Sequence, residues 1–93
     1  MKLQQAFGEA LRRHRKISGL SQEDFFKVSG RTYLSELERG LKTPTLDKID
    51  ALASTIGIHP ISLLAECYKI KDEVSIDDLW RQVDKDLTRA DDP

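Results

Sequence analysis

Residues 31–40, RTYLSELERG, form a short polar segment that ends in a glycine. Leu34 and Leu37 lie three positions apart, so a helix would place both on one buried face. The rest of the segment carries hydrogen-bonding side chains, which are Arg31, Thr32, Ser35, Glu36 and Arg39. A helix with so many donors and acceptors is suited to presenting them to a polar partner.

The size and composition of the chain indicate one small globular domain. Its 93 residues, 39% apolar and 33% charged, have room for one compact core. No apolar run approaches the roughly 20 residues that span a bilayer. The amino end, MKLQQAFGEALRRHRK, places its cations after its apolar residues, unlike a signal peptide. We therefore expect a cytoplasmic protein without a membrane partner.

Charge is divided unevenly along the chain. Residues 1–43 carry nine Lys/Arg and five Asp/Glu, a net charge of +4, whereas residues 44–93 carry six and eleven, a net charge of −5. This division is typical of a protein with one surface facing a polyanion and another facing away from it. Two ordinary solvated surfaces would give the same count, so charge alone leaves both interpretations open.

Apolar spacing predicts an all-α chain of six helices. Steps of three and four residues predict helices over 3–18, 46–56 and from Pro60 onward. Ser21 is a natural N-cap for a short second helix, which Ser29-Gly30 ends, and the third helix is the stretch quoted above. A sixth helix begins at Ser75, which forms a capping-box pattern with Asp78.

The second and third helices have the pattern of a helix-turn-helix. A short capped helix, a tight turn and a helix with polar residues at its amino end can place those residues in the major groove of DNA. Arg, Ser and Thr are suited to base edges there. Gln22, at the start of the second helix, can bind a backbone phosphate. The pattern predicts DNA binding, provided that the two helices adopt this geometry.

Residues 7–64, about two thirds of the chain, resemble the phage-repressor type of helix-turn-helix domain, also called the xenobiotic-response-element family. The most specific parts of the match are Leu11-Arg12 with Arg15, GLSQE, YLSELERG, and Pro44-Thr45-Leu46. The resemblance implies a five-helix domain that binds double-stranded DNA, usually as a dimer on an inverted-repeat operator.

The resemblance also assigns roles to individual residues. Those that would face bases are Arg31, Thr32, Ser35 and Glu36; those that would contact the DNA backbone are Gln22, Arg39, Lys42 and Thr43. Arg15 and Glu38 match an ion pair that joins the first helix to the third. Two roles stay open. Tyr33 has the spacing for packing, which we favour, or for a backbone contact, and the Glu36 carboxylate would accept from cytosine but repel phosphate.

The chain departs from the family between Gln22 and Arg31, where it has eight residues and the family usually has ten. Phe26 also stands where a small residue is usual. We therefore expect the turn to be rebuilt around Ser29-Gly30 and the second helix to lose part of a turn. The angle of the third helix depends on this rebuilding.

The domain organisation follows from these elements. We predict a helix-turn-helix DNA-binding domain over residues 1–67, a charged linker over 68–74, a C-terminal helix over 75–88 and a flexible tail over 89–93. The C-terminal helix carries an apolar stripe, which consists of Leu79, Trp80, Val83 and Leu87. The stripe either caps its own domain or packs against a second subunit, and we favour dimerisation.

Other chemistry finds little support in the sequence. It contains no set of residues that indicates an enzyme, and we expect no cofactor. His14 and His59 have no second ligand at metal spacing. Cys67 is a single cysteine, so an internal disulfide is excluded; whether it is a buried hydrophobe or a redox sensor stays open.

The predicted function is that of a small transcriptional regulator that acts as a homodimer on an inverted repeat through a recognition helix at Arg31–Glu38. The alternative is a protein-interaction module of the same fold, such as an antitoxin or an adaptor. The sequence does not distinguish activation from repression.

Overall fold

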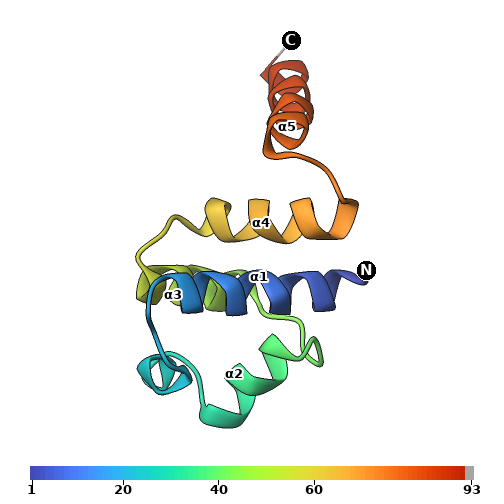
Figure 1. Cartoon of the computed structure of the whole chain (residues 1–93). Helices are drawn as coiled ribbons and strands as arrows, with labels where there is room; N and C mark the ends of the chain where they lie inside the picture. The colour runs from blue at the N-terminus through green and yellow to red at the C-terminus, as the bar shows by residue number, and fades with distance from the viewer. Residues whose placement is uncertain (92–93) are drawn as a thin grey trace.

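The computed structural model describes residues 1–91, which form five α-helices and one 3₁₀ helix (Figure 1). In chain order these are α1 (Leu3–Ile17), η1 (Gln22–Phe25), α2 (Arg31–Glu38), α3 (Leu46–Ile56), α4 (Pro60–Asp72) and α5 (Ile76–Asp91). The all-α class with a helix-turn-helix is confirmed. The described residues contain five α-helices instead of six, because the predicted second helix is a single 3₁₀ turn.

The helices pack in layers around α1. Figure 1 shows α4 along one side of α1 and α2 on the other, while α5 projects beyond α4 at the end of the molecule far from α2. Leu34 and Leu37, the two expected core residues of α2, are both completely buried and belong to the same core as Phe7 and Leu11 of α1. Burying a side chain of this size contributes about 1.5–3 kcal/mol. The core therefore fixes which face of α2 points outward.

The predicted helix ends are largely where capping residues placed them. Thr45 and Ser75 each accept a hydrogen bond, of 3.1 Å, from the backbone N–H three positions on. Gly19 and Gly57 end α1 and α3 with φ angles of +72° and +89°, a left-handed conformation that glycine adopts without a Cβ clash.

Two predicted boundaries in the C-terminal third are wrong. α4 continues to Asp72, so most of the predicted linker is helical, and α5 continues to Asp91, so the first part of the predicted tail is helical as well. Ile70 extends the apolar face of α4 onto the core, and Lys69 and Lys71 suit the negative end of the helix dipole. The rest of the predicted tail, residues 92 and 93, lies outside the described residues.

The turn before α2 is rebuilt around Ser29-Gly30, as predicted. The backbone N–H groups of Val28 and Ser29 both donate to the Phe25 carbonyl, at 3.0 and 2.9 Å. Ser29 is buried, and the Lys48 ammonium donates to the Val28 carbonyl. These contacts pair backbone groups of the short segment that joins η1 to α2. They hold the start of α2 in a defined place.

Gly8 allows α1 and α2 to approach each other closely. A Cβ atom at residue 8 would lie 2.7 Å from the Glu38 carbonyl oxygen and closer still to that of Leu37. Both obstacles are backbone atoms of α2, so they can give way only if the helix moves. The lack of a side chain at Gly8 therefore sets the distance between the two helices.

We predict that Gly8→Ala lowers the free energy of unfolding by about 1–3 kcal/mol, because overpacking outweighs the gain in helix propensity. Urea denaturation followed by circular dichroism measures the change. Glu9→Ala, one residue along on the exposed side of α1, is the control and should stay within about 0.5 kcal/mol of the wild type. A Gly8→Ala protein as stable as the wild type would contradict the close approach.

Candidate nucleic-acid interface

The outward face of α2 contains the four predicted base-contact residues. Arg31 and Thr32 are exposed in the first turn, and Ser35 and Glu36 follow, half-buried, one turn later. Since Leu34 and Leu37 anchor the opposite face in the core, these four side chains share one side of the helix. They are brought together as a short row at the amino end of α2.

The Glu36 carboxylate is partly balanced by a nearby cation. Lys42 places its Nζ atom 4.0 Å from Glu36 Oε2, and the Lys42 side chain is 53% exposed. A nearby positive charge reduces the repulsion between this carboxylate and a phosphate. Glu36 belongs to the second turn of α2, and Lys42 belongs to the loop between α2 and α3.

Tyr33 belongs to the packed side of α2. It is half-buried against the hydrophobic core, and the Lys48 ammonium lies 5.6 Å from the centre of its ring. This position matches the packing alternative that we favoured from the sequence. Its aromatic ring helps to seat α2 beside the rebuilt turn.

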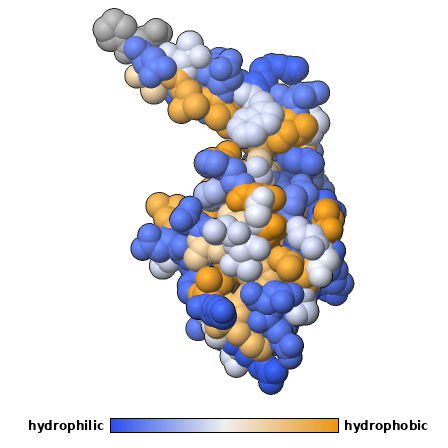
Figure 2. Space-filling view, turned by 90° about the vertical axis from the view of Figure 1, so that its left-hand side faces the viewer, coloured by the Kyte–Doolittle hydropathy of each residue, from blue (hydrophilic) through white to orange (hydrophobic). Residues whose placement is uncertain are grey.

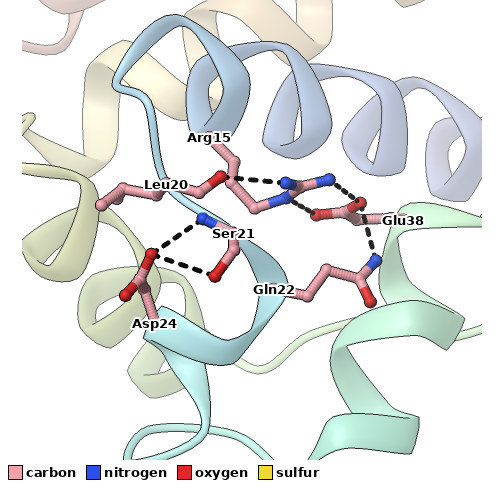
Figure 3. A network of polar contacts seen from close by, with 6 residues as sticks. All are labelled: Arg15, Leu20, Ser21, Gln22, Asp24 and Glu38. Carbon is pink, nitrogen blue, oxygen red and sulfur yellow. Dashed lines mark hydrogen bonds and ion pairs between the residues drawn. The ribbon is translucent and has the colours of Figure 1, made fainter.

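Arg15 and Glu38 form a bidentate ion pair between α1 and α2 (Figure 3). Arg15 Nε and Nη2 donate to the two Glu38 oxygens at 2.6 and 2.9 Å, and Nη1 donates to the Leu20 carbonyl at 3.0 Å. The Arg15 and Glu38 side chains are only 11% and 5% exposed. The hydrogen bond to Glu38 raises the pKa of Arg15 despite its burial.

The Gln22 side chain, which we predicted to contact a phosphate, forms a hydrogen bond within the protein. Its Nε2 atom donates to Glu38 Oε1 at 3.2 Å, so the side-chain amide is already tied to the ion pair (Figure 3). Just before it, the Ser21 N–H donates to Asp24 Oδ2 at 2.8 Å and caps η1. The structure therefore makes Gln22 part of the network that joins η1 to α2.

A basic hollow lies between α1, η1 and α2, beside the outward face of α2. Its lining residues are Arg12, Arg15, Lys16, Gln22, Ser35, Glu38 and Arg39. Glu38 neutralises only Arg15, which leaves the cations of Arg12, Lys16 and Arg39 at the exposed rim. Three exposed cations beside the outward polar row of α2 are suited to binding phosphates.

We predicted no DNA contact for Arg12 or Lys16 from the sequence. The signal was available, because these residues are four positions apart and therefore lie on one face of α1. What the sequence does not state is that this face of α1 lies next to the carboxyl half of α2. Only the packing of the two helices brings the charges into one site.

Thr43, a predicted backbone contact, is exposed in the loop between α2 and α3. Its hydroxyl accepts a hydrogen bond from the Gln4 side-chain amide, which ties the loop to the amino end of α1. Lys42 precedes it on the same exposed stretch. The loop therefore carries one exposed hydroxyl and one exposed cation directly after α2.

The two histidines have structural partners. His14 Nε2 lies 3.5 Å from Glu66 Oε1, and His59 Nδ1 accepts the Ile61 N–H at 3.0 Å, which caps α4. Burial raises the pKa of Glu66, but hydrogen bonds and charges from Arg13 and Lys69 outweigh it, so the net pKa is lowered. These contacts hold α1 against α4.

Cys67 is 1% exposed in the core, and burial raises the pKa of its thiol to about 11. A thiol in this state is protonated at neutral pH and is a poor nucleophile. The structure therefore places Cys67 among the small buried hydrophobes, the first of the two alternatives.

The apolar stripe of the C-terminal helix is only partly covered. Leu79 and Val83 line a shallow groove against α4, together with Ile61, Leu64 and Tyr68. Trp80 and Leu87 remain 43% and 61% exposed, and no α5 residue that the structure describes is fully buried. Figure 2 shows α5 standing out from the body of the molecule, with apolar atoms along its side.

The fold and the polar face define a helix-turn-helix protein. Residues 11–63, more than half of the chain, match the helix-turn-helix family model HTH_3. The chain belongs to this family, a class of DNA-binding transcriptional regulators and not of enzymes, and the resemblance to phage repressors is confirmed. None of the helices within residues 1–91 has the length and apolar character required to cross a membrane.

Several known proteins are similar to the chain. The immunity repressor protein of Bacillus phage phi105 is 27% identical over 92 residues, which cover 89% of this chain and 63% of the repressor. The control protein C.BamHI of Bacillus amyloliquefaciens is 38% identical over 61 residues, 62% of this chain and 75% of that protein. The chain therefore spans somewhat less than two thirds of the phage repressor.

Two solved structures share the fold. The clp gene regulator ClgR of Corynebacterium glutamicum superposes with a TM-score of 0.70 and 27% identity, covering 97% of this chain and 90% of ClgR. The restriction-modification controller protein C.AhdI of Aeromonas hydrophila gives a TM-score of 0.60 and 39% identity, covering 64% of this chain and 94% of C.AhdI.

Proposed function

We propose that the chain regulates transcription by binding an inverted-repeat operator in double-stranded DNA as a homodimer, with α2 as the recognition helix. The observation that carries the proposal is the outward polar row on α2 with exposed cations close to it. Arg12, Lys16 and Arg39 line the basic hollow that also contains Ser35, and Lys42 lies 4.0 Å from Glu36. Side chains that can read bases thus lie next to cations that can bind phosphates, the combination that a major groove requires.

The charge distribution supports the same orientation. The acidic half of the sequence ends in α5, which carries Asp77 and Asp78 in its first turn. α5 lies at the end of the molecule far from α2 (Figure 1). A polyanion that approaches α2 therefore meets the basic half of the chain, and the acidic helix lies away from it.

The dimer part of the proposal rests on α5. Two half-sites of an inverted repeat are read by two recognition helices held about 34–36 Å apart, or a multiple of that distance. A fixed separation requires a contact between subunits, and the exposed Trp80 and Leu87 offer apolar area for one. Residues 1–72 contain all of the buried core, so α5 is not needed to complete it.

Selection of bound sites from random duplex DNA tests the proposal. We expect an enriched sequence with two-fold symmetry, bound with an affinity that falls steeply as salt increases, since each phosphate contact contributes about −0.9 to the logarithmic slope. Failure to enrich any sequence, with weak and salt-independent binding, would overturn it. That result would favour the alternative of a protein-interaction module.

A prediction for Arg31 separates base reading from phosphate binding. Arg31→Ala should cost about 1–3 kcal/mol on the selected operator and relax the preference at one base position in each half-site. Fluorescence anisotropy with the operator and with random DNA measures both effects. Arg12→Ala is the matched control, because removing a rim cation should weaken binding to both DNAs and lower the salt slope by about 1. Equal losses of Arg31→Ala on both DNAs would remove Arg31 from the reading role.

A further inference from the structure

Phe26 lies directly beside the first residue of the recognition helix. It follows η1, is half-buried, and its backbone N–H donates to the Glu23 carbonyl at 3.1 Å. The Arg31 guanidinium lies over its ring, with Cζ 5.3 Å from the ring centre. The Arg31 side chain forms no hydrogen bond or ion pair with the described residues, so the contact with the Phe26 ring is the interaction that holds it.

Arg31 needs such a contact because its position is otherwise unfavourable. It is the first residue of α2, where the helix dipole disfavours a positive charge. It is also long and exposed, so a free side chain would sample many rotamers. An aromatic face within about 6 Å attracts a guanidinium and restricts those rotamers.

Contact with an aromatic ring differs from an ion pair in the number of guanidinium N–H groups that it leaves free. A carboxylate partner would occupy the N–H groups along the edge of the guanidinium, whereas a ring occupies only its flat face. A ring offers no carbonyl or carboxylate oxygen to the guanidinium, so the five N–H donors stay available for a bidentate contact to guanine O6 and N7. The ring can therefore orient Arg31 without competing with a base.

The rebuilt turn makes this pairing stable. The two residues are only five positions apart, and the segment between them is held by the bonds to the Phe25 carbonyl and by the clamp from Lys48 to the Val28 carbonyl. Ser29, inside the segment, is buried. The shortened turn thus holds the bulky Phe26 side chain next to the first residue of α2.

We propose that Phe26 is a positioning residue that sets base specificity by holding the Arg31 guanidinium for a guanine in the operator. This inference rests on the proposed function, because it assumes that α2 reads DNA. It goes beyond that function by assigning a role to a residue with no predicted DNA contact and by naming guanine as the base that it serves.

The test compares Phe26→Leu with Phe26→Tyr on the selected operator and on operators changed at the base assigned to Arg31. Phe26→Leu removes the π face and should reduce the discrimination at that base about two- to fivefold, with unchanged affinity for random DNA. Phe26→Tyr keeps the face and should retain the wild-type discrimination. In an Arg31→Ala background, Phe26→Leu should change nothing at that base.

A measurement without DNA completes the test. The ring current of Phe26 should shift the side-chain proton resonances of Arg31 in the wild type and in Phe26→Tyr, and a folded Phe26→Met or Phe26→Leu protein should lose the shift. Equal affinity losses on every DNA, undiminished discrimination in Phe26→Leu, or unshifted Arg31 resonances in the wild type would each overturn the proposal. Failure of the wild type to select any DNA sequence would instead overturn the proposed function, a different result.

Discussion

Replacing Glu38 with alanine is expected to lower the free energy of unfolding by about 3–5 kcal/mol, because it leaves the Arg15 charge buried without a partner. Glu38 accepts three hydrogen bonds, two from Arg15 and one from Gln22, and its side chain is only 5% exposed. A small domain has about 5–15 kcal/mol of stability in total, so a large part of it would be lost. Urea denaturation at low temperature measures the change.

Two further variants show whether the stranded charge is the cause. Arg15→Met combined with Glu38→Leu removes both charges and should cost less than Glu38→Ala alone. Glu23→Ala, at an exposed position of η1, removes a carboxylate with no buried partner and should stay within about 0.5 kcal/mol of the wild type. If the double variant is less stable than Glu38→Ala, the packing of the two side chains, and not the charge, carries the effect.

The elements that could be predicted are those that local rules determine. The bounds of α2 follow from Leu34 and Leu37 on one face and from the residues that end the helix on either side. The helix starts at Thr45 and Ser75 follow from side chains that bond to a backbone N–H three residues away. In each case the partner lies within one turn, so the sequence alone contains both halves of the interaction.

The features that could not be predicted depend on packing between distant segments. Nothing local states that Gly8 faces the backbone of α2, or that Arg12 and Arg39 line one hollow. The Gln22 amide is another example, since its bond to Glu38 forms only when η1 and α2 are both in place. The length of α4 is a further example, because its charged carboxyl-terminal residues have the composition of a linker, while Ile70 still reaches the core.

The position of α2 is therefore fixed by the segments that pack against its two ends. The Arg15–Glu38 pair fixes the carboxyl end of α2 to α1, and the rebuilt turn fixes its amino end beside Phe26. Side-chain contacts, and not helix propensity, hold both ends of α2 in place. A short helix of eight residues has little stability of its own, so this support determines the direction in which its outward polar face points.

Replacing Trp80 with alanine is expected to weaken the proposed homodimer by about 2–4 kcal/mol, roughly 30- to 1000-fold in its dissociation constant. Aromatic side chains dominate buried interfaces, and Trp80 is 43% exposed beside the groove between α4 and α5. Helical content should change little, because no residue of α5 is part of the core. Affinity for the complete inverted repeat should fall sharply, whereas affinity for an isolated half-site should stay nearly constant.

Analytical ultracentrifugation decides whether α5 joins two subunits or only covers its own domain. Lys85→Ala, an exposed polar position on the same helix, is the control and should leave the association unchanged. A wild type that sediments as a monomer at concentrations on the order of 10 µM would contradict the dimer, since such a contact would be too weak to hold two recognition helices at a fixed spacing. In that case the groove between α4 and α5 would serve its own chain, and Trp80→Ala would alter stability without altering the preference for a complete repeat over a half-site.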